Sequence, residues 1–144
     1  MGCYNLNKLY DPYRGKWVVE TPEEQVRQKV IAELVFLGYP KSLISVEKSV
    51  VDQTSYSSAN RRFDILCSTK HNEGLIPLLL IECKDKTDMS AIAQVVGYNE
   101  RIGAPFVCIA SKDLRFTQCA HPGFLAITWD EEIPSFNELN SYIS

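Results

Sequence analysis

The sequence predicts an α/β fold in which a mixed central β-sheet is flanked by helices. Two segments with helical periodicity lie at about 21–37 and 90–102, and apolar runs typical of strands lie between and after them. The expected order is therefore helix, three strands, helix, strand. The second helix has the length of a crossover between parallel strands, so the sheet should contain a parallel pair beside an antiparallel hairpin.

Composition favours a single globular domain over residues 1–144, with a core at about 21–111. Of the 144 residues, 45% are hydrophobic and 23% are charged, which is ordinary for a domain of this length. No apolar run approaches the ~20 residues that span a bilayer, and the first residues lack the pattern of a signal peptide. The five cysteines show no CxxC spacing and indicate reduced thiols, so we expect a cytoplasmic protein without membrane contact.

The first helix has the clearest start and end. The segment before it is expected to be irregular or a β-hairpin, because 11–15 (Asp-Pro-Tyr-Arg-Gly) has turn composition. Thr21 can cap the helix, and Glu24 can close a capping box. The helix should end at Gly38, after an apolar stripe formed by Val26, Val30, Leu34 and Leu37.

The remaining elements follow from apolar runs bounded by turn residues. A short helix is expected near Ser135, and the second long helix should place Val95 and Asn99 on one face. Strands are expected at 44–51, 62–68, 77–84, 106–110 and 124–129.

The runs at 62–68 and 77–84 predict a β-hairpin, because a polar loop containing glycine separates them. If this hairpin is symmetric about Glu73, Asp64 lies directly opposite Glu82, since both are nine positions from the tip. Directly opposed residues point to the same face, with Cβ atoms ~4.5–5.5 Å apart.

Two carboxylates and an amine are thus expected to converge at the open end of the hairpin. Glu82 and Lys84 share one face and Cys83 takes the other, because strand side chains alternate. Facing acids destabilise a sheet, and a hard cation such as Mg²⁺ resolves the conflict because it prefers carboxylate oxygens. The alternative is a solvent-facing strand end where Lys84 partly neutralises Asp64 and Glu82.

This motif and the order of elements resemble the PD-(D/E)XK nuclease superfamily. More closely, the chain is similar to stand-alone relatives of the type I restriction enzyme R-protein N-terminal domain, over about Leu9 to Ser111. Phe63 stands where the superfamily has proline. The segments that carry the resemblance are Tyr10-Asp11-Pro12, Lys16-Trp17-Val18, 21–28, 38–41, Val46-Glu47-Lys48, Arg62-Phe63-Asp64, 79–84, Gln94 and Tyr98-Asn99.

The resemblance implies a restriction-endonuclease-like three-layer fold with an αβββαβ core. It also implies hydrolysis of nucleic acid, most often DNA, with Mg²⁺ as cofactor and Mn²⁺ as a substitute. Asp64 and Glu82 would hold the metal ion together with the backbone carbonyl of Cys83. Lys84 would position or help deprotonate the attacking water and stabilise the developing negative charge.

Three further side chains are candidates for the site. The helical wheel places Glu23 near the centre of the apolar arc and Glu24 off it. The resemblance implies that Glu23 holds a metal-bound water or second metal; otherwise both acids simply favour the helix N-terminus. Gln94 and Tyr98 lie one turn apart and match a Gln-x-x-x-Tyr element that contacts the substrate backbone. Otherwise Tyr98 is a half-buried core aromatic and Gln94 a surface residue.

Three functional interpretations remain open. The first is a metal-dependent nuclease that acts on DNA. The second is a catalytically silent, nuclease-like binding or scaffold subunit of a defence or repair complex, which the formal net charge of −3 favours because bulk attraction to nucleic acid is weak. The third is a salt-bridge cluster without metal. A homodimer or a partner subunit is expected for the first two, since two cuts in a duplex need two sites.

Overall fold

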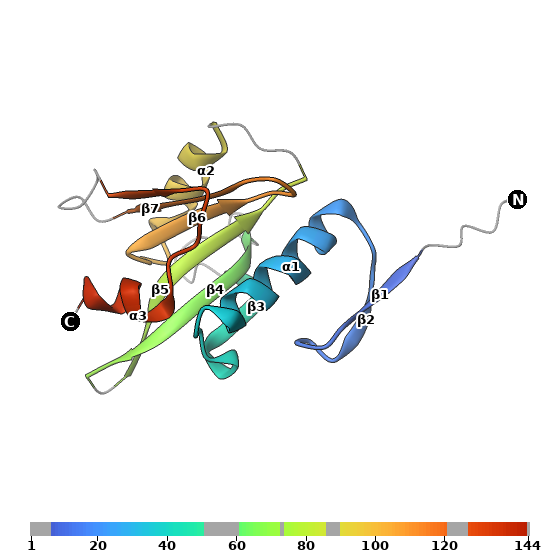
Figure 1. Cartoon of the computed structure of the whole chain (residues 1–144), viewed down its shortest axis with the longest axis horizontal. Helices are drawn as coiled ribbons and strands as arrows, with labels where there is room; N and C mark the ends of the chain where they lie inside the picture. The colour runs from blue at the N-terminus through green and yellow to red at the C-terminus, as the bar shows by residue number, and fades with distance from the viewer. Residues whose placement is uncertain (1–6, 51–60, 73, 86–89, 121–126, 144) are drawn as a thin grey trace, which may run out of the picture.

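The computed structural model describes residues 7–50, 61–72, 74–85, 90–120 and 127–143 (Figure 1). The core elements α1, β3, β4, β5, α2 and β6 follow one another in the predicted order. In full, the elements of the described residues are β1 (Lys8–Asp11), β2 (Lys16–Val19), α1 (Pro22–Phe36), η1 (Lys41–Leu43), β3 (Ile44–Val50), β4 (Arg61–His71), β5 (Gly74–Cys83), α2 (Ser90–Asn99), β6 (Phe106–Ala110), β7 (Arg115–Cys119), β8 (Thr128–Asp130) and α3 (Phe136–Ser141).

A mixed sheet with the strand order β3-β4-β5-β6-β7-β8 forms the centre of the molecule. Strands β5 and β6 pair in parallel, and the other neighbouring strands pair antiparallel. Helix α2 connects β5 to β6, so the predicted parallel crossover beside an antiparallel hairpin is confirmed.

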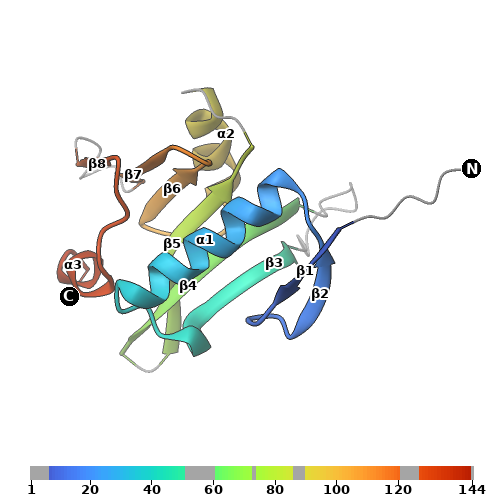
Figure 2. The same cartoon turned by 45° about the vertical axis from the view of Figure 1, so that its right-hand side comes forward.

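Helices cover both faces of this sheet. Val30 of α1 and Leu139 of α3 share a buried cluster with Ile81 of β5, whereas Val95 of α2 packs against Leu80 in a second cluster. Figure 1 and Figure 2 show α1 running across the sheet on one side and α2 lying on the other. The predicted three-layer α/β fold is therefore confirmed.

Helix α1 has the predicted N-cap, Thr21, and the predicted end at Gly38, whereas the Glu24 carboxylate that was expected to close a capping box pairs with Arg14 and Arg27. The Thr21 hydroxyl accepts a hydrogen bond from the backbone N–H of Glu24 at 3.0 Å, which satisfies one of the unpaired donors of the first turn. After the last turn, Gly38 has a φ of +91°, a conformation that glycine adopts without the steric cost of a Cβ atom.

The C-terminal part of the sheet differs most from the prediction. Strand β7 was missed because Arg115–Cys119 mixes polar and apolar residues and lacks an apolar run. Strand β8 is Thr128–Asp130 and overlaps the expected 124–129 only at Thr128 and Trp129, while 124–126 lie outside the described residues. The short helix near Ser135 is confirmed, with the Ser135 hydroxyl capping the N–H of Glu138 at 3.1 Å.

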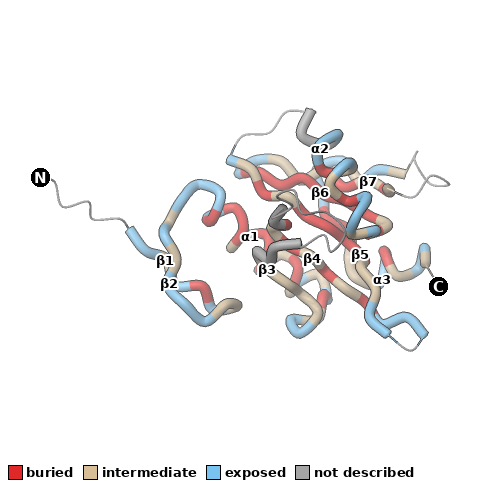
Figure 3. The backbone as a smooth tube through the Cα atoms, turned by 180° about the vertical axis from the view of Figure 1, so that it is seen from behind, coloured by how far each residue is buried: buried red, intermediate tan, exposed pale blue. Residues whose placement is uncertain are grey.

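Residues before α1 form the separate hairpin β1–β2, one of the two expected alternatives. Figure 3 shows that much of this hairpin is exposed, in contrast to the buried centre of the main sheet. Tyr10 and Trp17 stack edge to face on its outer side, with ring centroids 5.3 Å apart. Asp11, on the other side, is fully buried.

The described cysteines agree with what the composition predicts for thiols, and the described helices bear on the question of membrane spans. The described cysteines are all buried and no disulfide joins them, which agrees with the expected reduced thiols. Within the described part of the chain, no helix has both the length and the apolar character needed to cross a membrane.

Candidate active site

The open end of the β4–β5 hairpin has the register that the sequence predicted. Ile65 pairs with Ile81 and Leu66 with Leu80, as the predicted register requires, and the regular ladder ends there, one residue before Asp64 and Glu82. The charge of Asp64 nevertheless acts on Glu82, so the two acids lie near each other. The turn is tighter than expected, because His71 already pairs with Gly74. A shift in register between Cys67 and Ser68 compensates for this difference, as a β-bulge does by adding one residue to a strand.

Asp64 interrupts the alternation of faces along β4. Residues two apart on a strand normally face the same side, yet Phe63 packs with Val95 on the α2 side and Ile65 packs with Val30 on the α1 side. The carboxylate of Asp64 thus lies where the strands leave their regular pairing, with one oxygen toward α1 and the other toward the β5 backbone.

Both oxygens of Asp64 accept hydrogen bonds. Arg27 of α1 donates from Nη2 to Oδ1 at 2.9 Å, and the backbone N–H of Cys83 donates to Oδ2 at 2.7 Å. Burial opposes the charge on Arg27, but the hydrogen bond and negative charge of Asp64, with the charge of Glu24, outweigh it and raise the pKa of Arg27 above its ordinary value. Asp64 is therefore held from two sides and has a buried cation as partner.

Glu24, and not Glu23, is the buried acid of the first helical turn. Glu23 is exposed, so the expectation that it faces inward was wrong. Glu24 accepts hydrogen bonds from Arg14 at 2.5 Å and from Arg27 at 2.7 Å. These two arginines bury the Glu24 carboxylate, and its contact with the site runs through Arg27 rather than directly.

Glu82 has different surroundings on the α2 side. Burial, followed by the negative charge of Asp64, raises the pKa of Glu82 to about 7, although the charge of Lys84 acts in the opposite direction. The Lys84 ammonium lies 3.5 Å from the Glu82 carboxylate, and both side chains are partly exposed. Glu82 therefore gains or loses a proton near neutral pH.

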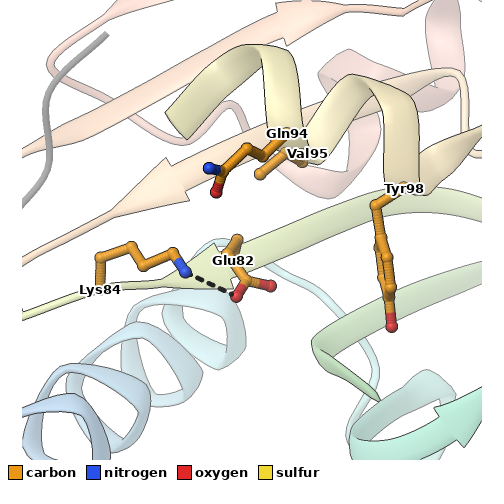
Figure 4. Close-up of a pocket in the computed structure, with 5 residues that line it drawn as sticks. All are labelled: Glu82, Lys84, Gln94, Val95 and Tyr98. Atoms are coloured by element: carbon orange, nitrogen blue, oxygen red, sulfur yellow. Dashed lines mark ion pairs between the residues drawn. The ribbon is translucent and has the colours of Figure 1, made fainter. Parts of the chain in front are cut away.

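A pocket of about 140 Å³ opens above Glu82 and Lys84. Figure 4 shows both side chains and Gln94 of α2 pointing into the same space, with Tyr98 one turn farther along α2. Gln94 is exposed, Tyr98 is half-buried, and the buried Val95 forms the apolar wall between them. The predicted set Glu82, Lys84, Gln94 and Tyr98 is thus brought together in one cavity.

Cys83 contributes its backbone rather than its thiol. The side chain is fully buried, and burial, followed by the negative charge of Asp64, raises the pKa of its thiol well above the ordinary value. Its N–H points toward Asp64, whereas the N–H of Lys84 bonds to Ala110 on the opposite neighbour, β6. Because the N–H and C=O of one strand residue point to the same side, the Cys83 carbonyl also faces β4.

The donor set suits a hard divalent cation that also binds substrate. The carboxylates of Asp64 and Glu82 lie near each other at one end of the hairpin, and the carbonyl of Cys83 is directed toward β4, the strand of Asp64. Mg²⁺ is commonly held by one or two carboxylates, with waters and substrate phosphate completing the coordination. Among the described residues, no group of three or more His, Cys, Asp or Glu side chains is placed to hold a metal ion, so the two carboxylates would need oxygen atoms from the backbone, water or substrate as further ligands.

Comparison with known proteins identifies the family. A family model described as type I restriction enzyme R protein N terminus matches residues 22–122. The chain belongs to this family. A solved fragment assigned as an HsdR subunit of a type I restriction enzyme from Vibrio vulnificus YJ016 has the same fold, with a TM-score of 0.56 and 17% sequence identity. The match covers 79% of this chain but 23% of that one, and a comparison with curated proteins gave no match.

Arg27 is the residue at the site that sequence reasoning missed. It lies on the buried arc of α1, three residues after Glu24 and one turn from Val30. A cation within an apolar helical face signals a buried anionic partner, since unpaired charges are rarely buried. That signal was present in the sequence, but it did not tell which acid would be the partner.

Proposed function

We propose that this domain is a metal-dependent nuclease of the PD-(D/E)XK type, and that its substrate is DNA. The observation that carries the proposal is the convergence of Asp64, Glu82 and Lys84 at the open end of one hairpin, beside a pocket that Gln94 and Tyr98 also line. DNA is the proposed substrate because the chain belongs to a restriction-enzyme subunit family.

In this proposal Asp64, Glu82 and the Cys83 carbonyl hold the metal ion. When bound, Mg²⁺ would offset the charge of a phosphodiester and lower the pKa of a water molecule. Asp64 is already oriented by Arg27 and by the Cys83 N–H, so little reorganisation is needed before binding. Glu82 must lose its proton before it can act as a ligand, which ties the activity to pH.

Lys84 would supply a second positive charge, next to the proposed metal ligand Glu82. Its ammonium lies beside Glu82 at the mouth of the pocket, where it can orient the attacking water and stabilise charge that develops in the transition state. Gln94 and Tyr98, from consecutive turns of α2, line the same pocket and would contact the substrate backbone. Glu23 is exposed on α1, and its proposed role in holding a second metal or water has no support from its position.

The test is cleavage of linear, nicked, branched and single-stranded DNA with Mg²⁺ or Mn²⁺. We expect cleavage by the wild type and its loss in Lys84→Ala. Lys70→Ala is the matched control, because Lys70 is exposed near the closed end of the same hairpin. A wild type that binds metal but cleaves none of these substrates would contradict activity of the domain alone.

A second candidate is a nuclease-like subunit that acts only with a partner. The net charge of −3 favours it, because the domain has little bulk attraction for DNA. The matched HsdR fragment is also much longer, since this chain spans 23% of it. Metal binding without turnover would support this candidate, and a search for a partner subunit or a homodimer would follow. An absence of metal binding would favour the third interpretation, in which Asp64, Glu82 and Lys84 form only a salt-bridge cluster.

A further inference from the structure

A chain of alternating charges connects the N-terminal hairpin to the candidate site. Asp11 pairs with Arg14 within the hairpin turn, and Arg14 pairs with Glu24 of α1. Glu24 in turn pairs with Arg27 at 2.7 Å, and Arg27 pairs with Asp64 of β4 at 2.9 Å. Each of these side chains has between 0 and 15% of its surface exposed.

The burial of this chain of charges is expensive for a purely structural element. Apolar residues of similar size often stabilise a fold as well as a buried ion pair does, whereas breaking such a pair is strongly destabilising. Asp11 is anchored further, since its carboxylate accepts from the backbone N–H groups of Tyr13 at 2.9 Å and Arg14 at 3.2 Å. Each charge has a defined partner, and the last partner is a proposed metal ligand.

The geometry at Asp64 shows what this arrangement can do. Arg27 engages Oδ1 and the Cys83 N–H engages Oδ2, so two contacts from different elements fix the plane of the carboxylate. An ionised carboxylate has about four lone-pair positions, which leaves positions on both oxygens for another ligand. Partners of this kind, one step behind a metal ligand, set its orientation.

We propose that the β1–β2 hairpin is part of the site's support: Arg14, acting through Glu24, holds Arg27, and Arg27 is the positioning residue of Asp64. The hairpin lies before residues 22–122, the part that matches the family model, and it reaches the site through the pair that Arg14 forms with Glu24. The inference rests on the proposed function only where it concerns metal binding.

The first test requires no metal and uses the backbone amide of Cys83 as a reporter of the Asp64 carboxylate. Hydrogen–deuterium exchange of this amide is measured by NMR and compared with exchange of the Ile81 amide on the same strand. We expect Arg27→Gln and Arg14→Gln to accelerate exchange at Cys83 about tenfold more than at Ile81, as for local loss of a hydrogen bond. Equal acceleration of both amides would overturn the inference, because it would reflect general destabilisation rather than loss of the Asp64 contact.

Matched variants keep the result interpretable. Lys8→Gln removes an exposed cation from the same hairpin and should leave the Cys83 amide unchanged. Arg14→Lys keeps the charge next to Glu24 and should restore part of the protection that Arg14→Gln loses. If Arg27→Gln does not fold, the two Arg14 variants still decide the question. Exchange at Cys83 that is the same in Arg14→Gln and in wild type would overturn the role of the hairpin.

The second test is titration of the same proteins with Mn²⁺ alone. Loss of an orienting partner typically weakens metal binding about 10–100-fold, so we expect that range for Arg27→Gln and the lower end for Arg14→Gln. Equal affinities in wild type and both variants would overturn the inference. A wild type that binds no Mn²⁺ would refute the proposed function instead, and the exchange measurement would still decide whether the hairpin holds Asp64.

Discussion

The two carboxylates at the open end of the β4–β5 hairpin, Asp64 and Glu82, lie in contrasting environments, although each directly follows the last regular pair of the ladder, Ile65 and Ile81. Asp64 is turned toward the α1 side, where Arg27 and a backbone N–H hold it. Glu82 is turned toward the α2 side, where its partner is the partly exposed Lys84 and its pocket is open. Burial and the charge of Asp64 raise the pKa of Glu82 to about 7.

This difference separates two properties at one strand end: Asp64 is held in a fixed orientation, and Glu82 can change its charge. On the α1 side, Asp64 is fixed through buried ion pairs that reach the N-terminal hairpin. On the α2 side, Glu82 titrates near neutral pH beside a pocket. If both acids hold a metal ion as proposed, Asp64 is the preorganised ligand and Glu82 the ligand whose charge depends on pH.

The largest expected effect comes from Glu82→Gln, which removes the titrating acid and keeps its shape. We expect cleavage to fall by about 10³–10⁴-fold, because a charged ligand at the reaction centre is lost. The metal-free domain should become more stable at pH 8, because the repulsion between Glu82 and Asp64 is gone. Cleavage rates and urea unfolding of the same preparation measure both effects, and a variant that loses stability at pH 8 would contradict the comparison.

Arg27→Gln removes the cation that pairs with Glu24 and Asp64 on the α1 side. Glu24 and Asp64 would then be left buried without the cation they share, so we expect a loss of about 3 kcal/mol in the free energy of unfolding. Chemical denaturation measures this value. Lys29→Gln, an exposed change on the same helix, should alter it by less than about 0.5 kcal/mol.

The pH dependence of the free energy of unfolding reports on the protonation of Glu82. Its pKa is raised on folding, from about 4.5 to about 7, so the folded state binds the proton more tightly. This stabilisation is complete below pH 4.5 and is lost as the pH rises through 7, by about 2–3 kcal/mol in the absence of metal. The quantity to measure is the difference in unfolding free energy between wild type and Glu82→Gln from pH 4 to 8. A difference that does not change with pH would show that the Glu82 pKa is not raised.

The smallest effect is expected from Gln94→Ala on the α2 side. Gln94 is exposed and lines the pocket, so its loss should change stability by less than about 0.5 kcal/mol. We expect the KM for DNA to rise by about tenfold, because one contact to the substrate backbone is lost. Steady-state kinetics separate this from a fall in kcat, and an unchanged KM would remove Gln94 from the substrate surface.

The sequence was sufficient for the α2 side of the site. Local patterns determine the hairpin register, the alternation of Glu82 and Lys84, and the one-turn spacing of Gln94 and Tyr98. The turn is one residue tighter than predicted, which alone would move the pairing by one residue. The register shift between Cys67 and Ser68 compensates for this, so the open end has the predicted pairs. Such compensation depends on packing along the whole hairpin, which a local pattern does not encode.

The α1 side could not be predicted in the same way. A helical wheel takes account only of the face of α1 that packs on the sheet, so it predicted that Glu23 would point inward. In the structure Glu23 is exposed, and Arg14 of the N-terminal hairpin covers Glu24 instead. The contact between Arg27 and Asp64 joins residues 37 positions apart. These ion pairs are set by how separate elements dock, and neither propensity nor periodicity of a single segment specifies docking.

Calorimetric titration with Mn²⁺ at pH 8, using wild type, Asp64→Asn and Glu82→Gln, decides whether the two acids form a metal site. We expect the wild type to bind the metal ion and each variant to lose at least about tenfold in affinity, since each lacks one charged ligand. Unchanged binding in both variants would refute the proposed site, because neither acid would then hold the metal ion.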